Sequence, residues 1–183
     1  MAESGPIKSH NLALALLLFL YWSIFGSQSC AQERQKYEIN AGYSCRRANT
    51  SVGPFNMNGI NIAVARNMNT WLGIVGDLGG YHAEGFREET YLFGPRISKR
   101  LKVKSSIFGQ VLIGGVHANA GARGLPSYTN GFATAIGGGM DYRLNRRIAI
   151  RTIQVEYLQT RLGSAVQHDI RATMGVVFFF GRP

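Results

Sequence analysis

The chain has 183 residues, of which 45% are hydrophobic and 16% are charged, and its formal net charge at pH 7 is +10. A chain of this length and composition is expected to fold as one domain, which excludes an intrinsically disordered protein. The positive charge admits an anionic partner. However, it is spread along the chain and accompanies no zinc-finger, RRM, helix-turn-helix or basic-helix pattern, so the sequence predicts no nucleic-acid partner.

Residues 1–31 have the layout of a cleavable signal peptide. Lys8 precedes a mostly apolar run from Leu12 to Phe25, and small or polar residues follow as far as Ala31. The run is shorter than the roughly 20 apolar residues that a membrane-spanning helix needs. We expect cleavage after Ala31; lipidation of Cys30 is the alternative, although the preceding Gln28 fits it poorly. Cleavage leaves Cys45 as the only cysteine and so allows no intramolecular disulfide.

After a short polar lead, residues 32–36, apolar and polar residues alternate with the two-residue period of β-strands. The alternation predicts eight strands, at residues 37–44, 60–65, 71–81, 90–98, 107–116, 131–142, 148–158 and 168–180. Short turns at 67–69, 99–104 and 143–147 alternate with longer loops at 46–58, 82–89, 117–130 and 159–167. Short periplasmic turns with longer external loops are typical of outer-membrane barrels. No segment has a sustained helical period, which argues against β-α-β folds.

Two of the predicted strands carry irregularities. Pro95 weakens the fourth strand or marks a bulge, because proline cannot donate to a ladder. In the seventh strand the alternation slips at residues 152–153. A bulge there would place Arg151, Gln154 and Glu156 on one face.

The two faces of the predicted sheet differ in composition. One is aliphatic, with residues such as Ile62, Ile74 and Val176. The other is rich in glycine and alanine and carries isolated charges at Asp77, Arg96, Asp141, Arg151, Glu156 and Arg171. Small residues with isolated ions suit the cramped interior of an eight-stranded barrel better than a water-facing surface. We therefore predict that the aliphatic face points outward to lipid and that the charged face fills the lumen.

The predicted lumen charges form pairs. If the last two strands meet about a centre between Gly163 and Ser164, Glu156 lies opposite Arg171. The same argument across the 82–89 loop places Asp77 diagonal to Arg96. Unpaired buried ions are costly, so matched charges are what an enclosed lumen requires. Exposed cross-strand ion pairs are the alternative.

Aromatic residues fall near both strand ends on the aliphatic face. Tyr37, Tyr142, Phe178 and Phe180 lie toward the termini, and Tyr43, Tyr91, Phe132 and Tyr157 lie toward the loops. Two such girdles are typical of rings at the two membrane interfaces. The last strand also places Thr173, Gly175, Phe178 and Phe180 in a polar-x-Gly-x-x-aromatic-x-aromatic pattern. The pattern resembles the closing-strand signal of bacterial outer-membrane barrels, although the tail at 181–183 departs from it.

The segments 91–96 (YLFGPR), 135–141 (AIGGGMD) and 151–157 (RTIQVEY) extend this resemblance. Residues 37–180 resemble small outer-membrane β-barrels of the OmpA-like or opacity-porin type. The resemblance implies an all-β fold, an eight-stranded antiparallel up-and-down transmembrane barrel, in the bacterial outer membrane with both termini periplasmic. We expect a monomer that contacts membrane lipid and lipopolysaccharide and is inserted by the barrel-assembly machinery. It implies no substrate.

The expected role is structural or surface-interaction rather than enzymatic, with a plugged lumen, and the sequence shows no cofactor motif or metal cluster. Three alternatives stay open: a soluble lipocalin-like barrel that binds an apolar ligand, a narrow channel, and a lipid A-modifying enzyme. The enzyme would use a triad of His168 and Ser164 with one of the two nearby acids, Asp169 or Glu156. Arginines in the predicted external loops could bind lipopolysaccharide phosphates, the alternative being ordinary solvated side chains: Arg46, Arg47, Arg87, Arg123 and Arg161.

Overall fold

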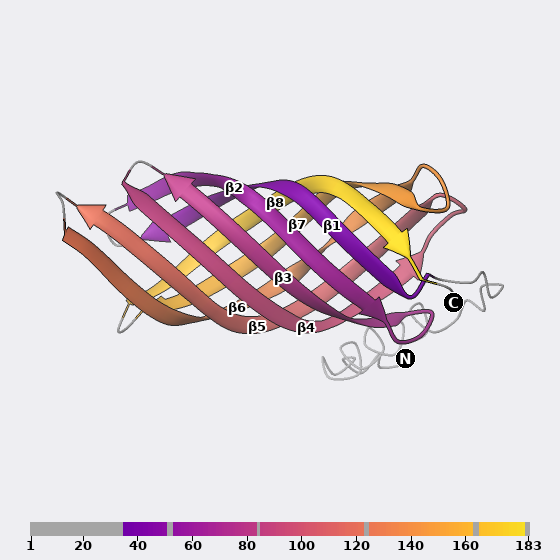
Figure 1. The fold of residues 1–183 in the computed structure, drawn as a ribbon, viewed down its shortest axis with the longest axis horizontal. Helices are drawn as coiled ribbons and strands as arrows, with labels where there is room; N and C mark the ends of the chain where they lie inside the picture. The colour runs from indigo at the N-terminus through magenta and orange to yellow at the C-terminus, as the bar shows by residue number, and fades with distance from the viewer. Residues whose placement is uncertain (1–34, 51–52, 84, 123–124, 163–164, 182–183) are drawn as a thin grey trace, which may run out of the picture. The chain divides into compact units, whose positions relative to one another are not determined.

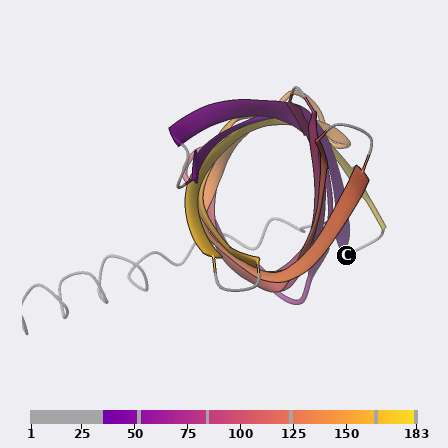
Figure 2. The ribbon, with the colours of Figure 1, turned by 90° about the vertical axis from the view of Figure 1, so that its left-hand side faces the viewer.

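The structure, a computed structural model, describes residues 35–50, 53–83, 85–122, 125–162 and 165–181. These residues form eight antiparallel strands, each paired with its neighbours in chain order, and the last strand pairs with the first to close a barrel. Figure 1 shows the barrel from the side, and Figure 2 shows the closed ring from one end. The strands are β1 (Tyr37–Thr50), β2 (Gly53–Asn67), β3 (Leu72–Ala83), β4 (Phe86–Arg100), β5 (Ser105–Ala122), β6 (Leu125–Arg143), β7 (Ile148–Leu162) and β8 (Ala165–Phe180).

The predicted signal peptide and Cys30 lie outside the described residues. Within the described ranges, no helix is both long enough and apolar enough to cross a membrane.

The strands extend further than the sequence predicts at the end away from the termini. The β1–β2 ladder, for example, continues to the pair Thr50 and Gly53. Gly53 and Gly85 have φ angles of 118° and 72°, a backbone conformation that favours glycine, and they stand where β2 and β4 begin. The loop prediction was therefore wrong in extent, because much of the following segments is strand: 46–58, 82–89, 117–130 and 159–167.

The two irregularities have different outcomes. The β4–β5 register is the same on both sides of Pro95, so the proline lies in the strand without causing a bulge. In β7 the register shifts between Arg151 and Gln154, and both side chains are buried together with Glu156. The bulge predicted at residues 152–153 is therefore present, and it keeps these three polar side chains inside the barrel.

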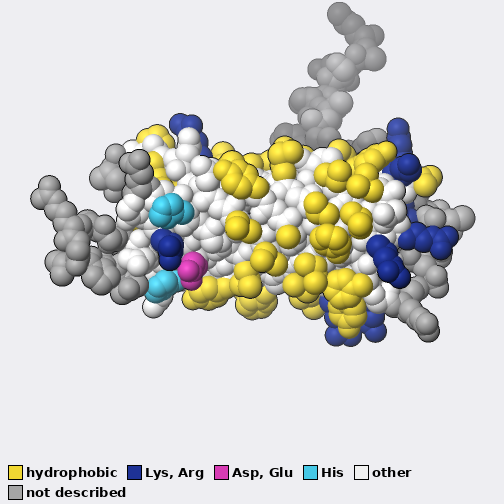
Figure 3. Space-filling view, turned by 45° about the horizontal axis from the view of Figure 1, so that its top comes forward, with side chains coloured by type: hydrophobic (Ala, Val, Ile, Leu, Met, Phe, Trp, Pro, Cys, Tyr) yellow, Lys and Arg dark blue, Asp and Glu magenta, His cyan; other side chains and the backbone are white. Residues whose placement is uncertain are grey.

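The aliphatic face points outward, as predicted. Ile62, Ile74 and Val176 are 47%, 51% and 37% exposed, whereas Ala63 and Val75, which point the other way, are at most 3% exposed. Figure 3 shows apolar side chains over the middle of the barrel wall, with Lys and Arg gathered at the end that holds the short turns. The arrangement is the inverse of a water-soluble barrel, whose apolar side chains face inward.

The lumen is packed with side chains. Its described apolar layer consists of small and aliphatic residues: Ala63, Ala65, Val75, Leu92, Leu112, Val116, Ala133, Ala135 and Leu158. Glycines on the inner face leave room for rings. A Cβ atom at Gly79 would lie 2.7 Å from the Tyr81 ring, and one at Gly139 would lie 2.8 Å from the Phe108 ring. The glycine-rich inner face thus lets large side chains fill a narrow interior.

The two groups of exterior aromatic residues lie at different distances from the ends of their strands. We call the end of the barrel at residues 68–71, 101–104 and 144–147 the turn end, and the opposite end the loop end. Tyr142, Phe178 and Phe180 lie near the turn end, with Tyr37 half-buried beside them. Tyr43, Tyr91, Phe132 and Tyr157, which the sequence places next to loops, lie well inside longer strands. Beyond them the exterior becomes polar, and we call this belt the outer polar rim: Arg47, His82, Arg87, Glu89, Arg161 and His168. The barrel wall therefore continues past its aromatic band at the end opposite the termini.

Candidate functional site: the ion-filled lumen

The structure places all six charged residues predicted for the lumen inside the barrel. None of them is more than 6% exposed: Asp77, Arg96, Asp141, Arg151, Glu156 and Arg171. Their strands bring them inward because each follows the same two-residue period as the glycines and alanines around it. Gln110 and Gln154 link the six through hydrogen bonds, and the partners of individual charges differ in part from those that the sequence predicts.

Arg171 is the centre of the first cluster. Glu156 stands opposite Arg171 in the β7–β8 ladder, and Arg171 Nε donates to Glu156 Oε2 at 2.7 Å. Arg171 Nη1 reaches across the lumen and donates to Asp77 Oδ1 at 2.9 Å and to the Tyr81 hydroxyl at 3.1 Å. One guanidinium thus bridges two carboxylates from strands on different sides of the barrel.

Neutral amides complete this first cluster. Asn61 Nδ2 donates to Asp77 Oδ2 at 2.9 Å. Gln110 Nε2 and Gln154 Nε2 donate to the two oxygens of Glu156, at 2.7 and 2.8 Å. Because the carboxylates accept several hydrogen bonds besides the ion pairs, the cluster meets the condition under which buried charges are tolerated.

The predicted pairing of Asp77 with Arg96 is wrong. The β3–β4 ladder places Asp77 opposite Leu92 and Arg96 opposite Gly73, two residues away from the register expected from the loop. Arg96 instead donates from Nη1 to Glu38 Oε2 at 3.4 Å. The error arises because the hairpin does not turn at the centre of the polar segment from which its register was predicted.

Arg151 and Asp141 form a bidentate pair near the turn end. Arg151 Nε donates to Asp141 Oδ1 at 2.8 Å and Arg151 Nη2 donates to Oδ2 at 3.1 Å. The remaining nitrogen, Nη1, donates to Gln154 Oε1 at 2.8 Å. This planar pairing is the geometry that arginine offers and lysine does not.

A further charge cluster, nearer the loop end, was missed. Arg46 donates from Nε to Asp169 Oδ2 at 2.9 Å and forms an ion pair with Glu88. All three side chains are buried, although Arg46 was predicted to be an external loop arginine. The signal that could have found it is the alternation of inward polar residues in β1, from Asn40 through Ser44, which Arg46 continues.

The triad proposed around His168 is not assembled. His168 points outward, where its ring stacks on Tyr157 with ring centroids 5.9 Å apart. Asp169 and Glu156 point into the lumen, where they bind Arg46 and Arg171. Ser164 lies outside the described residues. In the part of the chain that the structure describes, no group of three His, Cys, Asp or Glu side chains could hold a metal ion.

The residues of the predicted assembly signal lie at the seam between β8 and β1. Thr173 and Gly175 point inward; the Thr173 hydroxyl hydrogen-bonds Ser44 Oγ at 2.9 Å. Phe178 and Phe180 point outward, and the Phe180 ring stacks on Tyr37 with centroids 5.7 Å apart. The same residues that resemble a recognition signal therefore also pack the seam that closes the barrel.

The predicted lipopolysaccharide-binding arginines separate into different environments. Arg47, Arg87 and Arg161 are exposed and belong to the outer polar rim. Arg46 lies in the lumen, and Arg123 lies outside the described residues. The rim thus presents three arginines from β1, β4 and β7 on the outer surface.

Comparison with solved structures identifies the fold. Neisserial surface protein A (NspA) matches with a TM-score of 0.62 and 14% identity, over 79% of this chain and 97% of that protein. Ail, the attachment invasion locus protein of Yersinia pestis, matches with a TM-score of 0.57 and 17% identity, over 80% and 99% of the two chains. The N-terminal β-barrel domain of Pseudomonas aeruginosa OprF gives 0.51 and 15%, over 81% and 100%. No protein-family model and no curated protein sequence matches the chain.

At these identities the likeness concerns the fold. The chain has the closed eight-stranded architecture of small outer-membrane barrels, and the resemblance seen in the sequence is confirmed at that level.

Proposed function

We propose that the protein is an integral outer-membrane barrel, a monomer, with a structural or surface-interaction role. The observation that carries this proposal is the aliphatic wall that points outward around a lumen of paired ions. In water the apolar side chains would be stabilised by turning inward, by about 25 cal/mol for each Å² removed from solvent. In a bilayer the observed arrangement is the favourable one, since hydrocarbon surrounds the wall and the ions stay away from it.

The lumen is proposed to be a plug rather than a channel or a ligand cavity. Arg171 joins Asp77 and Glu156 across it, and the aliphatic layer around Leu112 and Leu158 fills the space beside them. A lipocalin-like protein would hold an apolar ligand in this same space. The packed interior therefore favours a role for the outer surface.

The proposed role is not catalytic. His168, the histidine on which the enzyme alternative depends, lies on the outer wall beside Tyr157, and the acids next to it in sequence or in the hairpin lie behind the wall. A hydrolytic triad needs these groups within hydrogen-bonding distance of each other.

Both termini are proposed to lie in the periplasm. The connections at the end that holds the termini, at residues 68–71, 101–104 and 144–147, are no shorter than those at the opposite end, so the support for this orientation comes from the strands. At the opposite end the strands continue past the aromatic band and end in the outer polar rim. Short periplasmic turns and a larger external part are the usual arrangement in this class of protein.

Cysteine labelling in cells tests location and orientation together. Cys45 is first replaced by serine, because it is exposed. We then expect Asn56→Cys, near the β1–β2 hairpin, to react in intact cells with a membrane-impermeant maleimide. Arg146→Cys, in the β6–β7 turn, should react only after the outer membrane is permeabilised.

The alternatives give different labelling patterns. The reverse pattern would contradict the orientation, and a soluble periplasmic barrel would leave both cysteines unlabelled until permeabilisation. The same assay tests the closing strand as a signal for the assembly machinery. Phe180→Ala is expected to reduce the Asn56→Cys label several-fold, while Phe93→Ala, which removes an exposed ring from β4, should leave it nearly unchanged.

Lipopolysaccharide is the partner that we propose for the outer polar rim. Arg47, Arg87 and Arg161 present guanidinium groups that can bind phosphate oxygens in a bidentate manner. Changing all three to serine is expected to reduce, several-fold, the lipopolysaccharide that co-purifies with protein extracted from outer membranes. The matched control changes Arg66, Arg146 and Arg147, which are exposed at the turn end. Equal losses in both triple variants would contradict a role for the rim.

A further inference from the structure

Exposed cations surround the barrel at its turn end. They lie before β1, near the end of β2, and in the β4–β5 and β6–β7 turns, so they are spread around the circumference. Figure 3 shows Lys and Arg side chains gathered at this end. Among the described residues, none of the six fully exposed ones has a carboxylate partner. We call these six the basic collar: Lys36, Arg66, Lys102, Lys104, Arg146 and Arg147.

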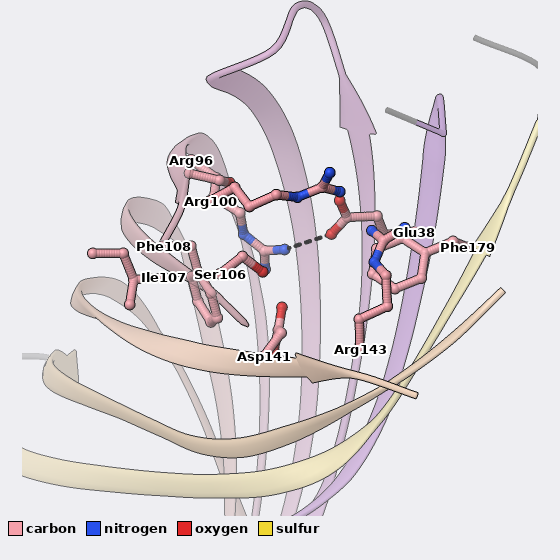
Figure 4. A pocket seen from close by; sticks show the side chains of 10 residues that line it. Glu38, Arg96, Arg100, Ser106, Ile107, Phe108, Asp141, Arg143 and Phe179 are labelled. Atoms are coloured by element: carbon pink, nitrogen blue, oxygen red, sulfur yellow. Dashed lines mark hydrogen bonds and ion pairs between the residues drawn. The ribbon is translucent and has the colours of Figure 1, made fainter. Parts of the chain in front are cut away.

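The acids at the turn end point into the lumen, away from the basic collar. Figure 4 shows Glu38 and Asp141 lining a pocket inside the mouth of the barrel. Glu38 accepts from Arg96 Nη1 at 3.4 Å, and Asp141 accepts from Arg151 Nε at 2.8 Å. Among the described acids only Glu89 is exposed, and it belongs to the outer polar rim at the loop end. The described exterior of the turn end therefore carries cations without a carboxylate.

The basic collar begins where the apolar wall ends. Val64 is 48% exposed on the outer face of β2, and Arg66 is the next side chain of that strand to point outward. Trp71, just before β3, is also 48% exposed, and its carbonyl accepts from the Ser98 amide at 2.7 Å. Tryptophan rings prefer the boundary between hydrocarbon and headgroups, and Lys and Arg stems can lie on apolar surface while their charged ends reach outward. The collar thus stands at the level of lipid headgroups.

We propose that the basic collar binds the phosphate headgroups of anionic phospholipids in the leaflet at the turn end. The inference rests on the membrane location proposed above and adds a selectivity among lipids. Lys and Arg close to an anionic lipid surface are attracted to it over about a Debye length. A folded acidic partner would match charge gathered on one side of the barrel. Charge spread around the circumference instead matches lipids, which surround the barrel on all sides.

Quenching of tryptophan fluorescence by brominated lipids tests this selectivity. The chain has two tryptophans, so Trp22→Phe leaves Trp71, which lies in the turn next to Arg66, as the only reporter. The full chain with this change is folded into phosphatidylcholine vesicles that contain about 20% phosphatidylglycerol. The bromines, on the upper part of the acyl chains, are placed either on the phosphatidylglycerol or on an equal amount of the phosphatidylcholine. The two samples then differ only in which headgroup carries the quencher.

We expect brominated phosphatidylglycerol to quench Trp71 at least about 1.5-fold more than brominated phosphatidylcholine, and about 1 M salt to remove the difference. Two triple variants locate the cause. Changing three collar residues close to Trp71 to glutamine should bring the ratio of the two quenching values close to one: Arg66, Lys102 and Lys104. The matched control removes three exposed charges from the outer polar rim and should leave the ratio unchanged: Arg47, Arg87 and Arg161.

Equal quenching by the two lipids would overturn the headgroup inference alone, because quenching itself shows that Trp71 lies in a bilayer. An equal fall of the ratio in both triple variants would also overturn it, since the preference would then follow net charge and not the collar. If neither lipid quenches Trp71, the membrane location fails and the inference fails with it. The comparison of the two brominated lipids keeps the collar intact, so it does not depend on the triple variants folding.

Discussion

Replacing Arg46 with alanine is expected to lower the free energy of unfolding by about 3–5 kcal/mol, whereas the same change at Arg47 should alter it by less than about 0.5 kcal/mol. The two arginines are adjacent in the sequence but point to opposite sides of β1. Arg46 is buried against Glu88 and Asp169, and Arg47 is exposed. Without Arg46, two carboxylates would remain inside the barrel with no counterion.

Urea titration of the barrel refolded in lipid vesicles measures this difference, with folded and unfolded protein separated by their gel migration. A third variant identifies the cause. Adding Glu88→Gln and Asp169→Asn to Arg46→Ala removes the stranded charges and should recover part of the lost stability. Similar small losses at Arg46 and Arg47 would contradict the burial of Arg46.

Replacing Met174 with arginine is expected to destabilise the barrel in a bilayer by about 2–4 kcal/mol, because a charge near the middle of the lipid face loses its hydration. The matched control is Val166→Arg on the same strand, for which the expected loss is about 0–1 kcal/mol. Met174 and Val166 are 63% and 44% exposed, so neither change disturbs the lumen. Val166 lies beyond His168 toward the loop end, opposite Arg161 and therefore at the level of the outer polar rim.

This pair of variants distinguishes lipid from water as the surroundings of the wall. Reversible unfolding from vesicles of fixed composition gives both free energies. On a water-facing sheet, an arginine at either position would be harmless and the two variants would unfold alike. That outcome would contradict the proposed membrane location, whatever the fold.

The wall and its inward charges could be predicted from the sequence because side-chain alternation in a strand has a period of two. Placing one residue of a strand places all the others. Ile62 and Ile74 therefore identify the outer face, and the inward position of Glu156 and Arg171 follows even across the β7 bulge. The pairing of Glu156 with Arg171 was predictable too, because the β7–β8 hairpin turns near the centre of its polar segment.

The strand ends could not be predicted in the same way. Beyond the aromatic band the outer face becomes polar, while the inner face mixes charged residues with an apolar cluster around Met57 and Tyr81. The two-residue alternation therefore no longer separates a paired strand from a loop, and Arg46 was assigned to the wrong environment. The partner of Asp77 was missed for another reason. A register predicted from a hairpin gives contacts between adjacent strands only. Asp77 and Arg171 lie on β3 and β8 and meet across the lumen. Contacts of that kind depend on closure of the sheet.

The ladder between β1 and β8 joins residues as far apart in the chain as Tyr37 and Phe180. No shorter nascent chain contains both sides of this ladder, so cylinder formation must wait for the final strand to be synthesised. Until then the sheet has two margins of unsatisfied amides and carbonyls, which hydrocarbon does not tolerate. Spontaneous insertion of one hairpin after another is therefore disfavoured for this topology. A factor that covers both edge strands until they pair with each other would lower the cost of insertion.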